Sequence, residues 1–194
     1  MSTLLILYVL LCDKVELEKV HFPNRITFIL DVSGSMNSSH FEVMANEVSF
    51  YVNKLNSTDC SWVQIILFND YPTTVYELGE EKTIDGGWFE LPSGTLPKSL
   101  YNLILTRRGN GGTSPYDAIN EVITYNKNYK DNYAIILVSD GLFSNEEEKL
   151  DKTVPVFTIC AEYNVGAMIK SLRLKQLCNI SKQTNGVCLP RISQ

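Results

Sequence analysis

The chain of 194 residues is 44% hydrophobic and 20% charged, a composition typical of one globular domain with a full core. Its 17 basic and 22 acidic residues give a formal net charge of −5, so the broad basic surface of a nucleic-acid-binding protein is not expected. The five cysteines include no CxxC pair and therefore indicate neither a zinc knuckle nor a dense disulfide framework. We expect reduced thiols; the alternative is a bridge between Cys178 and Cys188 in an oxidising compartment.

The first 24 residues differ in character from the rest of the chain. Leu4 to Leu11 form an apolar run that is too short to span a membrane. No Lys or Arg precedes this run and no clear small-x-small cleavage site follows it before Asp13, so we favour an extra buried strand over a signal peptide. We divide the chain into an N-terminal extension, residues 1–24, and one domain, residues 25–194. This interpretation favours the cytoplasm, whereas a signal peptide at residues 1–12 would imply secretion.

From Arg25 onward, short apolar runs alternate with segments of helical periodicity. The runs predict buried strands at Arg25 to Leu30, Trp62 to Phe68, Ala134 to Val138, Val154 to Ala161 and Gly186 to Ile192. The helices are predicted at Ser38 to Leu55, Lys98 to Leu105, after Ser114-Pro115 and at Met168 to Gln183. Thr73 to Leu78 predicts an antiparallel edge strand, and Gly79 to Pro97 a loop. This alternation predicts an α/β fold, a doubly wound and mainly parallel sheet with helices on both faces.

Oxygen-bearing side chains gather at three of the predicted loops. Asp31, Ser33 and Ser35 follow the first strand at alternate positions, Thr113 lies just before a helix, and Asp140 directly follows another strand. Ligands bind beyond the carboxyl ends of parallel strands at the switch point of such a sheet, so we expect the three loops to converge. Two carboxylates and three hydroxyls suit a hard octahedral ion such as Mg²⁺ or Mn²⁺.

A metal held in this way predicts a binding function. Because the hydroxyls stay neutral, the ion remains able to accept a carboxylate from outside the chain. We therefore expect a protein partner that contributes an acidic residue to the metal. Neither nucleic acid nor a membrane span is expected, and the sequence does not set the oligomeric state.

Two other interpretations compete with the metal site. Each loop can be an ordinary turn or helix cap, since Asp, Ser and Thr favour such positions. The rival of a different class is a Mg-dependent phosphoryl-transfer or other hydrolytic enzyme that uses Asp31. Such an enzyme generally has a second acid two residues later, where this chain has Ser33, and no GxxxxGK[ST] loop is present. The two histidines, His21 and His40, lie in an entry loop and at a helix start, so we expect no catalytic site.

The segment Asp31-Val32-Ser33-Gly34-Ser35-Met36, followed by Thr113 and Asp140, resembles the metal-ion-dependent adhesion site (MIDAS) of von Willebrand factor type A (VWA) domains. The resemblance runs from about Arg25 to Ile192 and leaves out the first 20 or so residues. It implies a Rossmann-like six-stranded sheet in the order 3-2-1-4-5-6, with strand three antiparallel. It also implies that the two serines and the threonine touch the metal, that the aspartates bind it directly or through water, and that the domain serves adhesion or scaffolding.

Overall fold

The computed structural model of the chain describes residues 22–55, 62–75, 81–82, 87–90, 96–143, 149–161, 166–189 and 191. The predicted N-terminal strand at Leu4 to Leu11 lies outside these residues. The division of the chain at residue 25 therefore stays a prediction.

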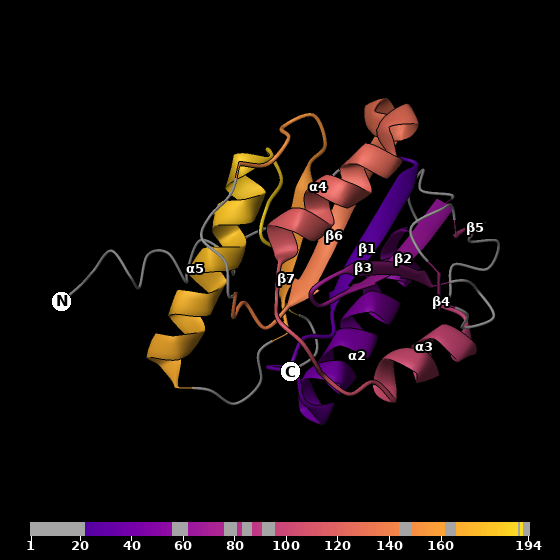
Figure 1. Ribbon diagram of the computed structural model, residues 1–194. Helices are drawn as coiled ribbons and strands as arrows, with labels where there is room; N and C mark the ends of the chain where they lie inside the picture. Colours follow the sequence, from indigo (N-terminus) through magenta and orange to yellow (C-terminus); the bar gives the residue numbers. More distant parts are fainter. Residues whose placement is uncertain are drawn as a thin grey trace.

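Four parallel strands form the centre of the sheet: β1 (Arg25–Asp31), β2 (Trp62–Phe68), β6 (Tyr133–Ser139) and β7 (Val156–Cys160). Three short strands extend it by antiparallel pairing: β3 (Pro72–Val75) and β5 (Trp88–Glu90) on β2, and β4 (Glu81–Lys82) on β3. The order is β4-β3-β2-β1-β6-β7, as Figure 1 shows. The strand order therefore reverses between β1 and β6, which makes their carboxyl ends the switch point of the sheet.

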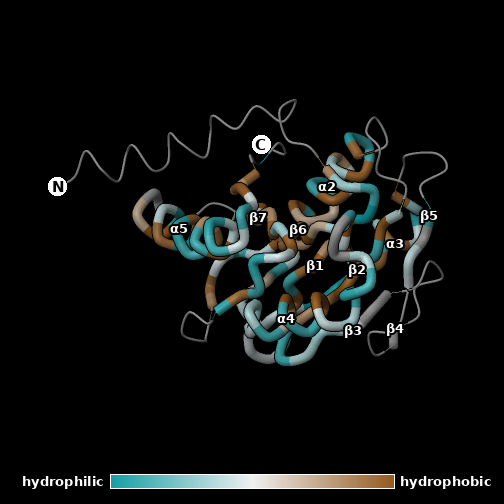
Figure 2. The backbone as a smooth tube through the Cα atoms, turned by 90° about the horizontal axis from the view of Figure 1, so that it is seen from above, coloured by the Kyte–Doolittle hydropathy of each residue, from teal (hydrophilic) through white to brown (hydrophobic). Residues whose placement is uncertain are grey.

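Helices cover both faces of this sheet. The helices are α2 (Ser38–Leu55), α3 (Lys98–Leu105), α4 (Pro115–Tyr125) and α5 (Ala167–Gln183), with a 3-10 helix η2 (Lys127–Asn132) after α4. Phe28 and Leu30 of β1 pack with α2 and α3, while Ile29 between them packs with α4 and α5. Side chains alternate across a strand, so both faces of β1 are buried, which explains its nearly continuous apolar sequence. Figure 2 shows α2 and α4 on opposite sides of the row of strands.

The prediction of a doubly wound, mainly parallel α/β sheet is confirmed, with three differences of detail. The antiparallel strand β3 is not the edge, because β4 lies outside it. The stretch predicted as a loop contains β4 and β5, which are too short to give a periodic signal. Of the predicted last strand, Gly186 to Ile192, the residues that the structure describes form a single parallel bridge, between Cys188 and Thr158. No helix within the described residues has both the length and the apolar character needed to cross a membrane.

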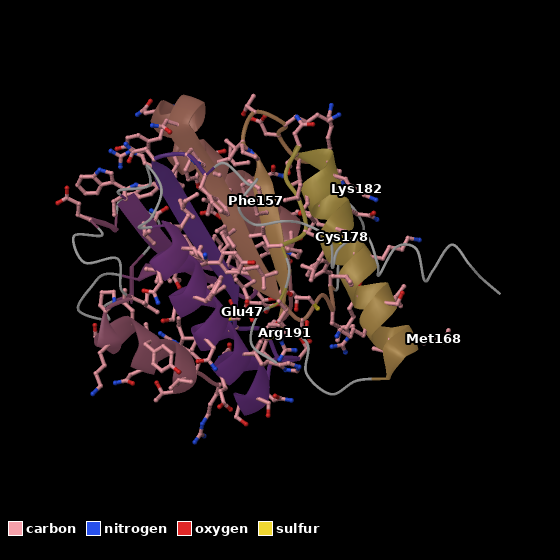
Figure 3. All side chains as sticks on the ribbon, turned by 180° about the vertical axis from the view of Figure 1, so that it is seen from behind. Glu47, Phe157, Met168, Cys178, Lys182 and Arg191 are labelled. Carbon is pink, nitrogen blue, oxygen red and sulfur yellow. A yellow bond between two sulfur atoms is a disulfide. The ribbon has the colours of Figure 1, made fainter. Side chains whose placement is uncertain are left out.

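A disulfide joins Cys178 in α5 to Cys188 beyond its end. The expectation of reduced thiols is therefore wrong for this pair, whereas Cys160 is free and buried. The chain reverses after α5, where Asn185 has a positive φ of 60° and the N–H of Gly186 donates to the carbonyl of Ser181. This reversal brings the two Cα atoms to 5.4 Å. Figure 3 shows Cys178 on the side of α5 that faces β7.

Replacing both bridged cysteines by alanine is expected to lower the free energy of unfolding by about 2 kcal/mol, because the cross-link that restricts the unfolded chain is lost. Urea unfolding of the wild type and of the Cys178→Ala/Cys188→Ala variant measures the difference. A reductant should destabilise the wild type by a similar amount and leave the variant unchanged. Equal wild-type stability with and without reductant would contradict the bridge.

Candidate functional site

Asp31 is the last residue of β1 and is fully buried at the carboxyl end of the sheet. Its Oδ1 accepts a hydrogen bond from the backbone N–H of Ser33 at 2.9 Å, which folds the chain back immediately after the strand. Its Oδ2 accepts a hydrogen bond from the Ser139 hydroxyl at 2.5 Å. The hydroxyl oxygens of Ser33 and Ser35 then lie 3.2 Å apart. The three residues therefore form one hydrogen-bonded group at the start of this loop.

The loop that carries Thr113 lies directly on the first loop. The backbone N–H of Gly34 donates to the carbonyl of Gly111 at 3.1 Å, and that of Asn110 donates to the carbonyl of Val32 at 3.0 Å. Gly111 has a φ of +73°, a conformation that favours glycine. Thr113 is 5% exposed and lies two residues before Pro115, the first residue of α4. In Figure 1, the link from α3 to α4 passes across the lower end of the sheet.

Gly109 explains why the two loops approach so closely. A Cβ atom at this position would lie 2.2 Å from the carbonyl oxygen of Ser33 and 2.4 Å from that of Met36. The far side of the loop is held by Asp70, whose Oδ1 accepts the backbone N–H of Gly112 at 3.0 Å. The position of Thr113 is thus fixed from two sides.

Asp140 follows β6, the strand that pairs with β1 in parallel register. Its carboxylate is fully buried, and Oδ2 forms an ion pair with Nη1 of Arg173 in α5 at 3.1 Å. Oδ1 accepts the backbone N–H of Leu142 at 2.9 Å. Gly141 has a φ of +77°, and a Cβ there would lie 2.7 Å from the carbonyl oxygen of Arg173. Helix α5 therefore packs tightly on this loop and neutralises the charge of its carboxylate.

The two aspartates differ in how their charges are compensated. Burial raises the pKa of Asp31 from 3.8 to about 6, although hydrogen bonds from Ser139 and Ser33 lower it, and the nearby charge of Asp140 raises it further. Within the described part of the chain no basic side chain forms an ion pair with Asp31, whereas Arg173 pairs with Asp140. Asp31 is therefore the carboxylate that would gain most from a cation.

His40 is buried at the start of α2 and contacts Asn37, which follows the first loop of the site. Its Nδ1 accepts the backbone N–H of Asn37 at 3.1 Å, while Oδ1 of Asn37 accepts the backbone N–H groups of Ser39 and His40. Burial lowers the pKa of this imidazole, and the nearby charges of Asp140 and Arg173 act on it in opposite directions. His40 thus forms part of the structured beginning of α2.

The predicted residues converge to different degrees. Asp31, Ser33 and Ser35 are bonded to one another, and the loop of Thr113 is hydrogen-bonded to theirs. Asp140 lies at the end of the neighbouring strand but is held by an arginine that the sequence did not single out. Ser139, which donates to Asp31, is a further residue of the site that the sequence does not predict, although its place before Asp140 at the end of a strand is a usable signal. No group of three or more His, Cys, Asp or Glu side chains suited to a metal occurs in the described ranges, so any ion here depends on hydroxyl oxygens.

Comparison with known proteins identifies a family. The sequence model of the von Willebrand factor type A domain family matches residues 26–165 of this chain. Comparison of the sequence with curated proteins gives no match. Among solved structures, a von Willebrand factor type A protein from Catenulispora acidiphila is similar with a TM-score of 0.57 and 17% identity, over 88% of this chain and 39% of that chain.

A second similar structure is proximal thread matrix protein 1 from the mussel byssus, described with a zinc-occupied MIDAS motif. It has a TM-score of 0.55 and 15% identity, over 88% of this chain and 44% of that chain. At such identities both structures support the fold alone. The chain spans less than half the length of either of these two proteins.

Proposed function

Because the chain belongs to the von Willebrand factor type A family, we propose that it is a divalent-metal-dependent protein-binding module for adhesion or scaffolding. In this proposal, an acidic side chain of the partner docks on a MIDAS metal. The residues that would hold Mg²⁺ or Mn²⁺ are Asp31, Ser33, Ser35, Thr113 and Asp140.

The observation that carries the proposal is the buried carboxylate of Asp31 beside two hydroxyls. A buried charge is costly unless an opposite charge or several hydrogen bonds compensate it, and burial dominates the pKa shift of this group. The hydroxyls of Ser33 and Ser35 are neutral and offer lone pairs on adjacent oxygens 3.2 Å apart. An all-oxygen donor set favours hard cations such as Mg²⁺ and Mn²⁺. The donor chemistry therefore fits the ion.

The ion pair between Arg173 and Asp140 makes the proposed site more attractive to an anion. A divalent ion together with Arg173 outweighs the charges of Asp31 and Asp140, so the loaded site keeps a net positive charge. A carboxylate from the partner would remove that excess. The mussel byssus protein, which has a similar fold, is described with zinc in its MIDAS motif, so the fold is compatible with a divalent ion.

The rival hypothesis of a phosphoryl-transfer or other hydrolytic enzyme finds less support. Ser33 stands two residues after Asp31, where such an enzyme generally has its second acid. Turnover assays with phosphate and ester substrates distinguish the two functions.

Saturating Mg²⁺ is expected to raise the melting temperature by about 5–10 °C, since an ion present at a hundred times its Kd adds about 2.7 kcal/mol to the free energy of unfolding. Differential scanning calorimetry with Mg²⁺ and with EDTA measures the shift. Thr113→Ala should reduce it, whereas Thr124→Ala, an exposed threonine in α4, should not. If titration calorimetry detects binding of neither Mg²⁺ nor Mn²⁺, the proposed metal site is wrong.

Partner binding is expected to depend on the same ion. Affinity capture followed by mass spectrometry should recover the partner in Mg²⁺ and lose it in EDTA or with Thr113→Ala. Thr124→Ala is again the matched control. A partner that is captured equally well under all these conditions would use another surface of the domain.

A further inference from the structure

A cavity of about 200 Å³ lies beside the first loop of the proposed metal site. Its polar lining consists of Asn69, Tyr71, Thr73, Arg107, Arg108 and Asn110. We propose that this cavity is a second acidic subsite, which binds a carboxylate side chain of the partner next to the one docked at the metal. The inference deepens the proposed function and rests on it.

The cavity shares a wall with the proposed metal site. Val32, which lies between Asp31 and Ser33, forms part of its lining, and its carbonyl accepts the backbone N–H of Asn110 at 3.0 Å. The loop that carries Arg107 and Arg108 therefore continues directly into the contact with the first loop. A partner segment that reaches the proposed ion has the cavity as its immediate neighbour.

The charge of the lining favours an anion. Two arginines contribute to it, and none of the described residues that line it is acidic. Asp70 lies between two lining residues in sequence, but its Oδ1 accepts the backbone N–H of Gly112, and its carboxylate lies against the Gly111 loop. Burial lowers the pKa of Arg107, and an anion beside the guanidinium would favour its charged form. Guanidinium groups bind carboxylates in strong charge-assisted hydrogen bonds.

A hydrogen bond connects the two loops that line the cavity, the turn after β2 and the loop after α3. Nδ2 of Asn69, in the turn between β2 and β3, donates to Oδ1 of Asn110 at 2.8 Å. Oδ1 of Asn69 accepts the backbone N–H of Tyr71 at 3.3 Å, and the side chain of Tyr71 is 77% exposed. The walls are thus pre-organised, with an aromatic ring accessible to the partner.

The size of the cavity indicates which anion it accepts. A volume of about 200 Å³ exceeds that of several water molecules but is below the roughly 300–1,000 Å³ of pockets that bind drug-sized ligands. The end of one side chain fits this space better than a nucleotide does. The inferred partner therefore presents two acidic side chains close together.

Capped glycine peptides that contain either one glutamate or two glutamates at different spacings are suitable probes. In Mg²⁺, the best-spaced peptide with two glutamates should bind about tenfold more tightly than the same peptide with the second glutamate replaced by glutamine. Arg107→Gln/Arg108→Gln should abolish this gain and leave the affinity for the single-glutamate peptide unchanged. Lys127→Gln, at the opposite end of the sheet, is the control and should keep the gain. Titration calorimetry measures the affinity of each of the three proteins for both peptides.

The half-buried Arg107 also affects packing, so two further measurements do not depend on its replacement. Arg108→Glu changes an exposed side chain and should favour a peptide whose second glutamate is replaced by lysine. In the wild type, the NMR signals of the arginine Nε–H groups should shift with the two-glutamate peptide and not with its glutamine counterpart. Unmoved arginine signals would overturn the subsite.

The same titrations separate the subsite from the proposed function. Binding of the single-glutamate peptide in Mg²⁺ but not in EDTA supports the metal, and its absence overturns the proposed function. If that binding is intact but no spacing gives a gain from the second glutamate, the subsite alone is overturned. A gain that persists in Arg107→Gln/Arg108→Gln also overturns it.

Discussion

Asp31→Asn is expected to raise the free energy of unfolding of the metal-free protein by about 2–3 kcal/mol at neutral pH. The substitution keeps the shape of the side chain and removes a fully buried charge. The carboxyl group has a pKa of about 6 in the folded protein and an ordinary value of 3.8. Each pH unit of this difference corresponds to about 1.4 kcal/mol. The amide can still accept from the Ser33 N–H with its oxygen and donate to the hydroxyl oxygen of Ser139 with its nitrogen.

The pH dependence of this effect has a definite sign. Below about pH 3.8 the carboxyl group is protonated in both the folded and the unfolded chain, so Asp31 imposes no electrostatic cost. Between pH 3.8 and about 6 the unfolded chain ionises first, and the stability of the wild type falls relative to Asp31→Asn. Above about pH 6 the full cost is present. The advantage of the variant should therefore grow across this window and then remain constant.

Urea unfolding in EDTA at a series of pH values measures the difference between the two proteins. Glu121→Gln, an exposed acid in α4, is the matched control and should change the stability by less than about 0.5 kcal/mol at any pH. In Mg²⁺ the order should change, because the wild type gains stability from the ion and Asp31→Asn does not. A metal-free variant less stable than the wild type at neutral pH would show that the carboxylate is compensated in the folded chain.

The sequence was sufficient to predict the elements that position the candidate site. The apolar run of β1 and the oxygen-bearing residues after it are local signals, and the alternation of strands and helices predicts a parallel sheet with a switch point. The meeting of Asp31 with the end of β6 follows from that topology. These features depend on short-range patterns that a single sequence carries.

What the sequence could not predict depends on contacts between distant segments. Arg173 lies in a helix whose apolar pattern is weak, and only the packing of α5 on the loop after β6 brings it to Asp140. The closeness of Gly109 to the first loop is equally invisible in sequence, where glycine indicates only a turn. The sequence does not determine the bridge between Cys178 and Cys188, because it depends on how the chain returns from α5 to β7. In each case the missing information is the geometry of tertiary packing.

Gly109→Ala is expected to lower the free energy of unfolding by about 3 kcal/mol or more and to weaken the response to Mg²⁺. The new methyl group would lie 2.2 Å and 2.4 Å from two backbone oxygens, those of Ser33 and Met36, and a backbone cannot move aside as a flexible side chain can. The loop of Thr113 must then shift away from Ser33. Stability and metal affinity should therefore fall together.

Gly34 and Gly166 provide comparisons for the loss of stability expected at Gly109. At Gly34 a Cβ would lie 3.2 Å from the carbonyl oxygen of Gly111, so Gly34→Ala should cost about 1 kcal/mol. At Gly166 a Cβ would meet no atom within 4 Å, so Gly166→Ala should cost less than about 1 kcal/mol. Urea unfolding in EDTA and in Mg²⁺ ranks the three variants. The close contact between the two loops leaves no room for a methyl group at residue 109. An equally small loss of stability in Gly109→Ala and Gly166→Ala would therefore refute that contact.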